Sequence, residues 1–409
     1  MKLKKKIFDL ALIYLLHFTF VACSKPATIY PIGTRLSQSG GLMIVRVPTF
    51  ADYSGFSPVE AMQDFPRYDK TSDDLWQLDV RSTDIARFDL SDRLYDLSYT
   101  TFDDKTKWPS KLPKGFDPKQ YMQLGKDPGL GIRDLHEKGI TGKNVGIAII
   151  DQALLVNHIE YKDQLRLYEE IHWTTSTTEA QMHGPALASI AAGKTVGVAP
   201  DADLYFIACW MGDNDSEGRF VFNLSYVAFA IDRIVAINTA LPANRKIRVI
   251  SISLGLNEKM AGYADVMKSI KRAEKAGIKT LFVSSDNFSG AGRDPLADPN
   301  NAASWTKGLY WSQYPADARA LLIPMDSRCT ASPTGDHDYV FYRDGGMSWT
   351  VPYVAGLYAL ACQQKPSVDF ADFWKALNAT SQPLVRNGEN IGKLINPEAM
   401  IAKIVDLGN

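Results

Sequence analysis

From about Gly125 to its C-terminus, the chain alternates short apolar runs with longer segments of helical periodicity. The apolar runs are nearly continuous, which is typical of strands buried on both faces of a parallel sheet. Strands that alternate with helices predict an α/β fold in which a doubly wound, mainly parallel sheet is flanked by helices. The predicted strands are residues 144–150, Asp203–Cys209, residues 249–252, residues 280–283 and Leu321–Pro324; the predicted helices are residues 131–138, His183–Ala192, residues 224–239, residues 262–276 and residues 348–362.

Residues 23–125 have a different texture and predict an N-terminal accessory segment. They are rich in Pro, Gly, Asp and Tyr, with short strand-like runs such as residues 41–47 between turn signals. Apolar residues recur at irregular short intervals over residues 76–102, which indicates extended pieces packed on a larger body. The sequence leaves open whether the segment is an accessory domain, an arm or a pro-segment. Residues 126–409 then form the main domain.

The N-terminus carries the pattern of a targeting signal. Four lysines within the first six residues precede an apolar run at residues 7–21, which is short for a bilayer span. Residues 1–22 are therefore predicted to be a signal peptide that is removed on export. The run ends in Phe20-Val21-Ala22-Cys23, which resembles the lipobox of bacterial lipoproteins. That resemblance implies that Cys23 becomes the lipid-modified N-terminus, anchored at the bacterial cell envelope or surface; a plain secretory signal is the alternative.

Composition and charge narrow the class of protein. The chain has 409 residues, of which 45% are hydrophobic and 22% charged, as in an ordinary globular protein. Its formal net charge is -1, and no long basic block follows the N-terminus, which argues against a nucleic-acid partner. No second apolar run reaches membrane-spanning length, so we expect the mature chain to be soluble apart from its lipid anchor. We also expect it to be a monomer.

The three cysteines beyond the signal cannot all pair within one chain. Cys209 ends an apolar strand and Cys362 lies in an apolar helix, so both are interpreted as small core residues. A disulfide that involves Cys329 stays open. Their spacing matches no metal-ligand pattern.

Three polar residues, in the order Asp, His, Ser, lie at the edges of predicted elements. Asp151 directly follows a buried strand, His183 begins a helix, and Ser348 follows two glycines at the start of another. Each alone has an ordinary explanation, as a turn cap, a structural histidine or a helix cap. Reacting groups of a parallel sheet gather beyond the carboxyl ends of its strands, so together the three predict a catalytic site.

The blocks around these residues, with two others, resemble those of the subtilisin-like serine proteases, or subtilases. The resemblance extends from about residue 131 to 360. The matching blocks are Ile149-Ile150-Asp151, His183-Gly184, Gly197-Val198-Ala199-Pro200, Ser251-Ile252-Ser253-Leu254-Gly255 and Gly346-Met347-Ser348-Trp349-Thr350-Val351-Pro352.

The resemblance implies a serine endopeptidase that hydrolyses proteins or peptides through an acyl-enzyme and needs no cofactor. Ser348 would be the nucleophile, His183 its general base, and Asp151 the group that fixes the imidazole tautomer. The side chain of Asn287 and the amide of Ser348 would stabilise the oxyanion. The substrate-binding residues implied are Ser253, Leu254 and Gly255, which would pair with the substrate backbone, and Ser284, Ser285 and Asp286, which would wall the primary specificity pocket.

Some residues near the triad depart from the family pattern. Gln152 and Ala153 stand where the family has Ser or Thr and then Gly, Pro185 begins the helix differently, and Trp349 is bulky. Asp286 replaces a glycine; its carboxylate would favour Lys or Arg before the scissile bond, or else turn to solvent or narrow the pocket. These departures keep open a binding protein at the cell surface that is weakly active or inactive. An esterase of the α/β-hydrolase type is disfavoured, because Ser348 lacks the Gly-x-Ser-x-Gly elbow.

Two further features are interpreted as structural. His158 lies near the aspartate block and receives no catalytic role. The stretch from Asp213 to Gly218 resembles the first half of a calcium loop, but Leu224 stands where a closing glutamate is needed. It is interpreted as a solvated surface loop, and no metal site is predicted.

Overall fold

The computed structural model describes residues 32–37, 43–72, 74–174, 177–283, 288–311 and 314–407. The predicted signal peptide with Cys23 lies outside these ranges, as do Ser284, Ser285, Asp286 and Asn287.

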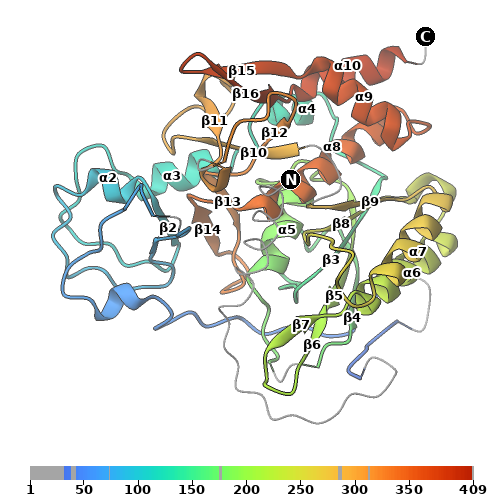
Figure 1. Cartoon of the computed structure of the whole chain (residues 1–409), viewed down its shortest axis with the longest axis horizontal. Coiled ribbons are helices and arrows are strands. Elements are labelled where there is room, and N and C mark those ends of the chain that lie inside the picture. The colour runs from blue at the N-terminus through green and yellow to red at the C-terminus, as the bar shows by residue number, and fades with distance from the viewer. Residues whose placement is uncertain are drawn as a thin grey trace.

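Five parallel strands form the central sheet, in the order β4-β5-β3-β8-β9 (Figure 1). Three strands follow the predicted apolar runs closely: β5 (Asp203–Cys209) matches at both ends, while β8 (Ile247–Ile252) and β9 (Lys279–Phe282) differ by one or two residues. β3 (Gly146–Asp151) is central and pairs with β5 and β8. β4 (Leu165–Ile171) was not predicted, because its charged residues interrupt the apolar pattern.

Helices cover both faces of this sheet, which confirms the predicted doubly wound arrangement. Alternate residues of β3 point to opposite faces, so Ile147 and Ile149 join one core while Ala148 and Ile150 join another. The first core also contains α5 (His183–Ala192) and α8 (Thr350–Gln364). The second contains α6 (Leu224–Ala240) and α7 (Tyr263–Lys275), which lie together at the right of Figure 1.

A second sheet, formed by strands that follow β9 in the sequence, packs its apolar residues into the first core. Its order is β11-β10-β12-β16-β15, and β12 pairs in parallel with both neighbours. The predicted strand Leu321–Pro324 is β12, so it belongs to this sheet and not to the central one. The other elements here are β10 (Phe288–Arg293), β11 (Trp305–Lys307), β15 (Gln382–Arg386), β16 (Glu389–Leu394), α4 (Ile132–Glu137), α9 (Phe370–Thr380) and α10 (Pro397–Asp406).

The accessory segment packs onto the main domain through a four-stranded sheet, β1-β2-β14-β13. β2 (Thr100–Asp103) pairs antiparallel with β14 (Tyr339–Tyr342). A third core joins aromatic residues of both parts, such as Phe102 and Phe341. The remaining elements are η1 (Pro58–Ala61), β1 (Leu78–Asp79), α2 (Leu94–Leu97), α3 (Pro118–Gly125) and β13 (Arg328–Ala331).

Arg35 and residues 43–45 pair with β4 as parts of an arm, and Thr49 pairs farther along the chain with Glu179. Arg35 forms an antiparallel bridge with Glu170, and Ile44 a parallel bridge with Tyr168. The bridge at Ile44 is the described part of the strand predicted over residues 41–47. Glu170 is fully buried, and its carboxylate pairs with the guanidinium groups of Arg35 and Arg46, as buried charges require. Within the described ranges, no helix is both long and apolar enough to cross a membrane.

Candidate active site

Asp151 and His183 are hydrogen-bonded at the carboxyl edge of the central sheet. Asp151 is the last residue of β3 and His183 the first of α5. The distance from His183 Nδ1 to Asp151 Oδ1 is 2.6 Å, and the two side chains are 12% and 4% exposed. When Nδ1 donates to this carboxylate, Nε2 is left as a proton acceptor on the other side of the ring. The pair therefore has the arrangement of a general base with its orienting group.

The turn after Asp151 supports this pair although its sequence departs from the family pattern. The Gln152 amide donates to Asp151 Oδ1 over 2.8 Å, and the His183 amide donates to Gln152 Oε1 over 3.4 Å. Gly184 must be a glycine here, because a Cβ would lie 2.5 Å from the Gln152 carbonyl oxygen. Pro185 lies in the first turn of α5, where its missing N–H costs nothing. The backbone amide of Gln152 thus supports the Asp151 carboxylate although this residue replaces the family's Ser or Thr.

Ser348 lies in η5 (Met347–Trp349), a single 3-10 turn that leads into α8. Both preceding glycines are required by the backbone. A Cβ on Gly345 would lie 2.1 Å from the Met325 carbonyl oxygen, and Gly346 has a φ of 69°. The Ser348 residue is partly exposed, so its side chain lies at the surface end of the buried helix α8. The two glycines that precede the serine in the sequence thus allow the close approach and the backbone conformation of this turn.

Trp349 connects the serine turn to the imidazole. The rings of His183 and Trp349 lie 5.5 Å apart at an interplanar angle of 57°, and Tyr342 meets the other side of Trp349 edge-on at 5.2 Å. The bulky residue that departs from the family pattern is thus a buried wall beside the base. Among the described residues no hydrogen bond joins the Ser348 hydroxyl to His183, so a proton transfer between them would need that hydroxyl to turn toward Nε2.

The predicted substrate-binding strand contacts the same turn. Ser253 follows β8, and its hydroxyl donates to the Ser348 carbonyl oxygen over 2.8 Å. The Leu254 carbonyl oxygen accepts from the Val283 amide over 3.2 Å, so it is occupied within the protein. Gly255 is partly exposed, and a Cβ there would meet no atom within 4 Å. Open space at Gly255 suits an approaching substrate backbone.

Two buried carboxyls beneath the serine turn were not predicted. Asp326 accepts from the amides of Gly345 and Leu309 over 3.0 and 2.7 Å, and Asp344 accepts from the Gly346 amide over 3.3 Å. Burial raises the pKa of Asp326 to about 6. Burial, and then the neighbouring Asp326, raise the pKa of Asp344 further above its ordinary value. In the sequence, the only indication of a role for Asp326 is its position just after the carboxyl end of the buried strand β12, where site residues of a parallel sheet gather.

His158 and the calcium-like stretch both have protein partners. His158 is fully buried, and its Nε2 lies 2.9 Å from the Asp338 carbonyl oxygen. Burial also lowers its pKa, in keeping with a structural role. Asp213 lies in the hairpin of β6 (Gly212–Asn214) and β7 (Phe220–Phe222), where it binds His172 Nε2 over 2.8 Å. The described ranges contain no group of three or more His, Cys, Asp or Glu placed to hold a metal ion.

The cysteines Cys209, Cys329 and Cys362 are buried free thiols, so Cys329 forms no disulfide in this structure.

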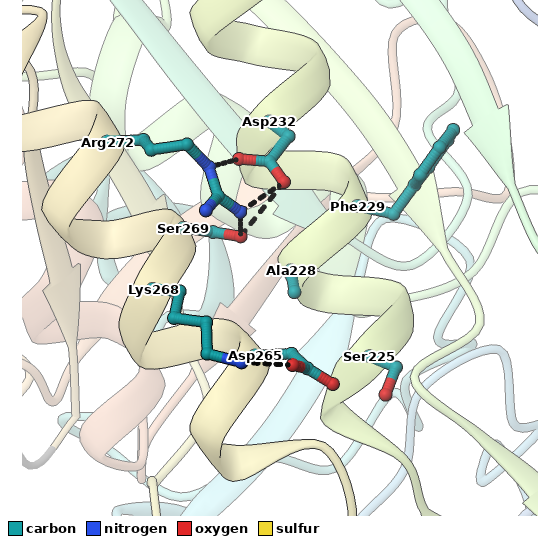
Figure 2. A pocket seen from close by; sticks show the side chains of 8 residues that line it. All are labelled: Ser225, Ala228, Phe229, Asp232, Asp265, Lys268, Ser269 and Arg272. Atoms are coloured by element: carbon teal, nitrogen blue, oxygen red, sulfur yellow. Dashed lines mark hydrogen bonds and ion pairs between the residues drawn. The ribbon is translucent and has the colours of Figure 1, made fainter.

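A groove of about 280 Å³ lies between α6 and α7, on the face of the sheet opposite α5 and α8 (Figure 2). Its charged side chains pair with one another. Arg272 binds Asp232 over 2.7 Å, and Lys268 binds Asp265 over 3.3 Å. These lining pairs satisfy each other's charge, so the groove offers a ligand little beyond solvated surface.

Comparison with known proteins agrees with the geometry. Residues 142–307 match the model of the subtilase family, a range that includes Asp151, His183 and Ser253 and ends before Ser348. Subtilisin-like protease 2 of Trichophyton rubrum is 26% identical over 258 residues, which are 61% of this chain and 58% of that protein. Subtilisin-like protease 2 of Arthroderma otae is 26% identical over 259 residues, or 61% and 57% of the two chains. The match thus spans less than two thirds of these relatives.

Two solved structures are also similar. The prenylagaramide maturation protease PagA has 18% identity and a TM-score of 0.46, with 67% of this chain and 98% of that chain covered. The PatG macrocyclase, solved in complex with a peptide, has 15% identity and a TM-score of 0.46, with 67% and 95% covered.

Proposed function

We propose that the chain is a subtilase, a serine endopeptidase that cleaves peptide bonds through an acyl-enzyme on Ser348; residues 142–307 match the subtilase family model. The observation that carries the proposal is the 2.6 Å hydrogen bond between His183 and Asp151. It lies at the edge of the sheet where the serine turn packs against the same imidazole through Trp349.

The proposed reaction begins when the Ser348 hydroxyl turns toward His183 Nε2. The imidazole takes the hydroxyl proton while the serine oxygen attacks the substrate carbonyl, and Asp151 stabilises the imidazolium that forms. His183 then gives the proton to the leaving amine, which departs and leaves the acyl-enzyme. Water attacks this ester by the same route, losing a proton to His183, and Ser348 regains its proton as the acid product leaves.

The oxyanion would be stabilised by the Ser348 amide and, by resemblance to the family, by the side chain of Asn287. Removing a donor of this kind lowers turnover on the order of 100 to 1000-fold. We further propose that Ser253 and Gly255 bind the acyl side of an extended substrate and that the Asp286 carboxylate favours Lys or Arg before the scissile bond. Peptide-library profiling of wild type and Asp286→Gly tests the last point, and an unchanged preference contradicts it.

We also propose that the enzyme is exported and held at the cell envelope by lipid on Cys23, as a monomer without a cofactor. The accessory segment would remain after the signal is removed, because β2 is hydrogen-bonded to β14 and Phe102 is buried against Phe341. N-terminal sequencing and mass spectrometry of the mature protein test both statements. A mature chain that begins beyond residue 103 contradicts retention, and a free thiol on Cys23 contradicts lipidation.

The competing proposal is a weakly active or inactive binding protein at the cell surface. It is favoured by the absence, among the described residues, of a hydrogen bond between the Ser348 hydroxyl and His183. Labelling with a fluorophosphonate, which reacts only with an activated serine, separates the two. The enzyme labels as wild type and fails to label as Ser348→Ala, while His183→Ala labels far more slowly. A folded wild-type chain that never labels supports the binding protein instead.

A further inference from the structure

A polar pocket of about 270 Å³ lies where the accessory segment meets the serine turn. Its lining includes Tyr68, Lys70, Asp74 and Trp76 from the accessory segment, and Leu309 and Asp344 from the main domain. We call it the Trp76 pocket. Neither part of the chain forms it alone, and the proposed mechanism assigns it no role.

Trp76 brings this pocket next to the nucleophile. Its indole Nε1 donates to the Asp344 carbonyl oxygen over 2.7 Å, and its ring lies 3.5 Å from where a Cβ on Gly346 would stand. Gly346 is two residues before Ser348. Trp76 has a φ of 52°, a left-handed conformation that costs a bulky residue roughly 1 kcal/mol or more. The surrounding contacts hold the indole over the serine turn despite this cost.

The pocket and the proposed acyl-binding strand approach Ser348 from different sides. Ser253, after β8, contacts the Ser348 carbonyl oxygen, whereas the pocket borders the residues that connect β14 to the serine turn. In Figure 1, β2 and β14 lie to the left of α5, while β8 and β9 lie to its right. A substrate whose acyl side follows Ser253 to Gly255 therefore directs its leaving-group side toward the Trp76 pocket.

We propose that the Trp76 pocket binds the leaving-group side of the peptide substrate and selects charged side chains there over aliphatic ones. The proposal rests on the proposed peptidase function. It deepens that function by assigning the accessory segment a part in substrate choice.

The charges at the pocket carry this preference. Lys70 and Asp74 are exposed, and neither belongs to an ion pair among the described residues. Gln77 anchors the backbone at Asp69 and Asp74, because its side chain accepts from the Asp69 amide over 2.9 Å and donates to the carbonyl oxygens of Asp69 and Asp74 over 2.9 and 3.0 Å. Tyr68 stacks on Tyr99 at 3.8 Å and 5°, which gives the pocket a rigid aromatic wall. The positive charge of Lys70 and the negative charge of Asp74 both lie at the pocket, and the anchoring of Asp74 by Gln77 lowers the ordering cost of binding a charged side chain there.

Acyl transfer measures leaving-group binding by itself. An ester substrate without a leaving peptide acylates Ser348, and an added amino-acid amide then competes with water. The amine attacks the acyl carbonyl, loses a proton to His183, and releases the Ser348 oxygen, which regains that proton. The acyl part is the same throughout, so for any one amine a change in the ratio of aminolysis to hydrolysis between variants reports a change in how the protein binds that amine.

For the wild type, aspartic acid amide and lysine amide should be better acceptors than leucine amide. Lys70→Glu should lower the aminolysis-to-hydrolysis ratio for aspartic acid amide by about five- to tenfold. Asp74→Lys should lower the ratio for lysine amide by a similar factor. Both factors correspond to about 1 kcal/mol, the size expected for one exposed charge pair. Ester hydrolysis should stay unchanged. Lys114→Glu is the matched control, since Lys114 is exposed on the same segment and does not line the pocket.

Two failures are distinguishable. If no acyl-enzyme forms, the peptidase function fails, and calorimetric binding of the three amides to wild type and Lys70→Glu tests the pocket instead. If acyl-enzyme forms but the ratios are equal for the three amines, or unchanged in both charge variants, the pocket has no role in selection and the proposal is overturned. In the calorimetric experiment, the proposal is overturned if the three amides bind Lys70→Glu as tightly as wild type.

Discussion

Phe102 of the accessory segment stacks on Phe341 of the main domain, with ring centroids 5.2 Å apart. Both side chains are buried, at 1% and 0% exposure, and their strands are neighbours in one sheet. Phe341 lies in β14, which leads directly to Asp344 and the serine turn. The accessory segment is therefore built into the support of the nucleophile.

Replacement of Phe102 by alanine should destabilise the whole chain. The cavity and the lost apolar burial cost about 3–5 kcal/mol for a large aromatic side chain in a core. Urea unfolding measures the loss in the free energy of unfolding. The control is Phe50→Ala, whose side chain is exposed and which should change stability by less than about 0.5 kcal/mol. A similar small change for Phe102→Ala would contradict the shared core.

Asp151→Asn should abolish most activity and leave the fold intact. The amide would donate to His183 Nδ1, place the imidazole proton on Nε2, and so remove the acceptor that Ser348 needs. The loss in kcat should be about 10⁴-fold, as expected for a wrong tautomer. Peptidase assays and the fluorophosphonate labelling rate measure it. Asp163→Asn, at an exposed aspartate just before β4, should keep full activity; equal activity in both variants would rule out the assigned role.

The buried carboxyls beneath the serine turn should make stability fall as pH rises. Burial raises the pKa of Asp326 to about 6, and the pKa of Asp344 is raised as well. The folded chain thus holds protons that the unfolded chain releases near pH 4, so the free energy of unfolding decreases from about pH 4 through 6 and above. Nearby Arg343 opposes both shifts without cancelling them.

Asp344→Asn resembles the protonated carboxyl and keeps an acceptor for the Gly346 amide. Its melting temperature should decline less than that of wild type between pH 5 and pH 8, and at pH 8 the variant should be the more stable by about 1 kcal/mol. Calorimetric melting at several pH values measures this. Asp92→Asn, at an exposed aspartate, should follow the wild-type curve. Parallel curves for Asp344→Asn and wild type would show that the carboxyl is not the source.

Gly345→Ala should disrupt the serine turn, because the new Cβ would lie 2.1 Å from the Met325 backbone oxygen. To relieve this clash the backbone must move at Gly345, three residues before Ser348, which should lower the free energy of unfolding by about 1–3 kcal/mol. Both urea stability and the labelling rate of Ser348 should fall. Gly255→Ala, placed in open space, should keep its stability. Unchanged labelling of Gly345→Ala would mean that the turn tolerates displacement.

Local patterns predicted the elements whose signals lie within their own sequence. The apolar run Asp203–Cys209 and the small-residue helix His183–Ala192 have the predicted bounds. β4 was missed, because its buried Glu169 and Glu170 are tolerated only through arginines far along the chain, such as Arg233. A strand pattern cannot show such partners.

The site also divides into residues that local sequence predicts and contacts that only the folded chain creates. Asp151 and His183 were predicted from their places at element edges, and the structure joins them by a hydrogen bond. Trp76 and Asp344 are 268 residues apart, and nothing in the local sequence of either indicates their contact. Asp326 likewise acquires its position from the Gly345 and Leu309 amides, which only the folded chain brings together.

The arm along β4 also bears on self-association. β4 is an edge strand, and its free backbone groups would otherwise be a template for pairing with another chain. Arg35 and Ile44 occupy part of that edge with this chain's own backbone, and the guanidinium groups of Arg35 and Arg46 cover the buried Glu170 carboxylate. The same segment that leads toward the N-terminus thereby protects the sheet from edge-to-edge aggregation.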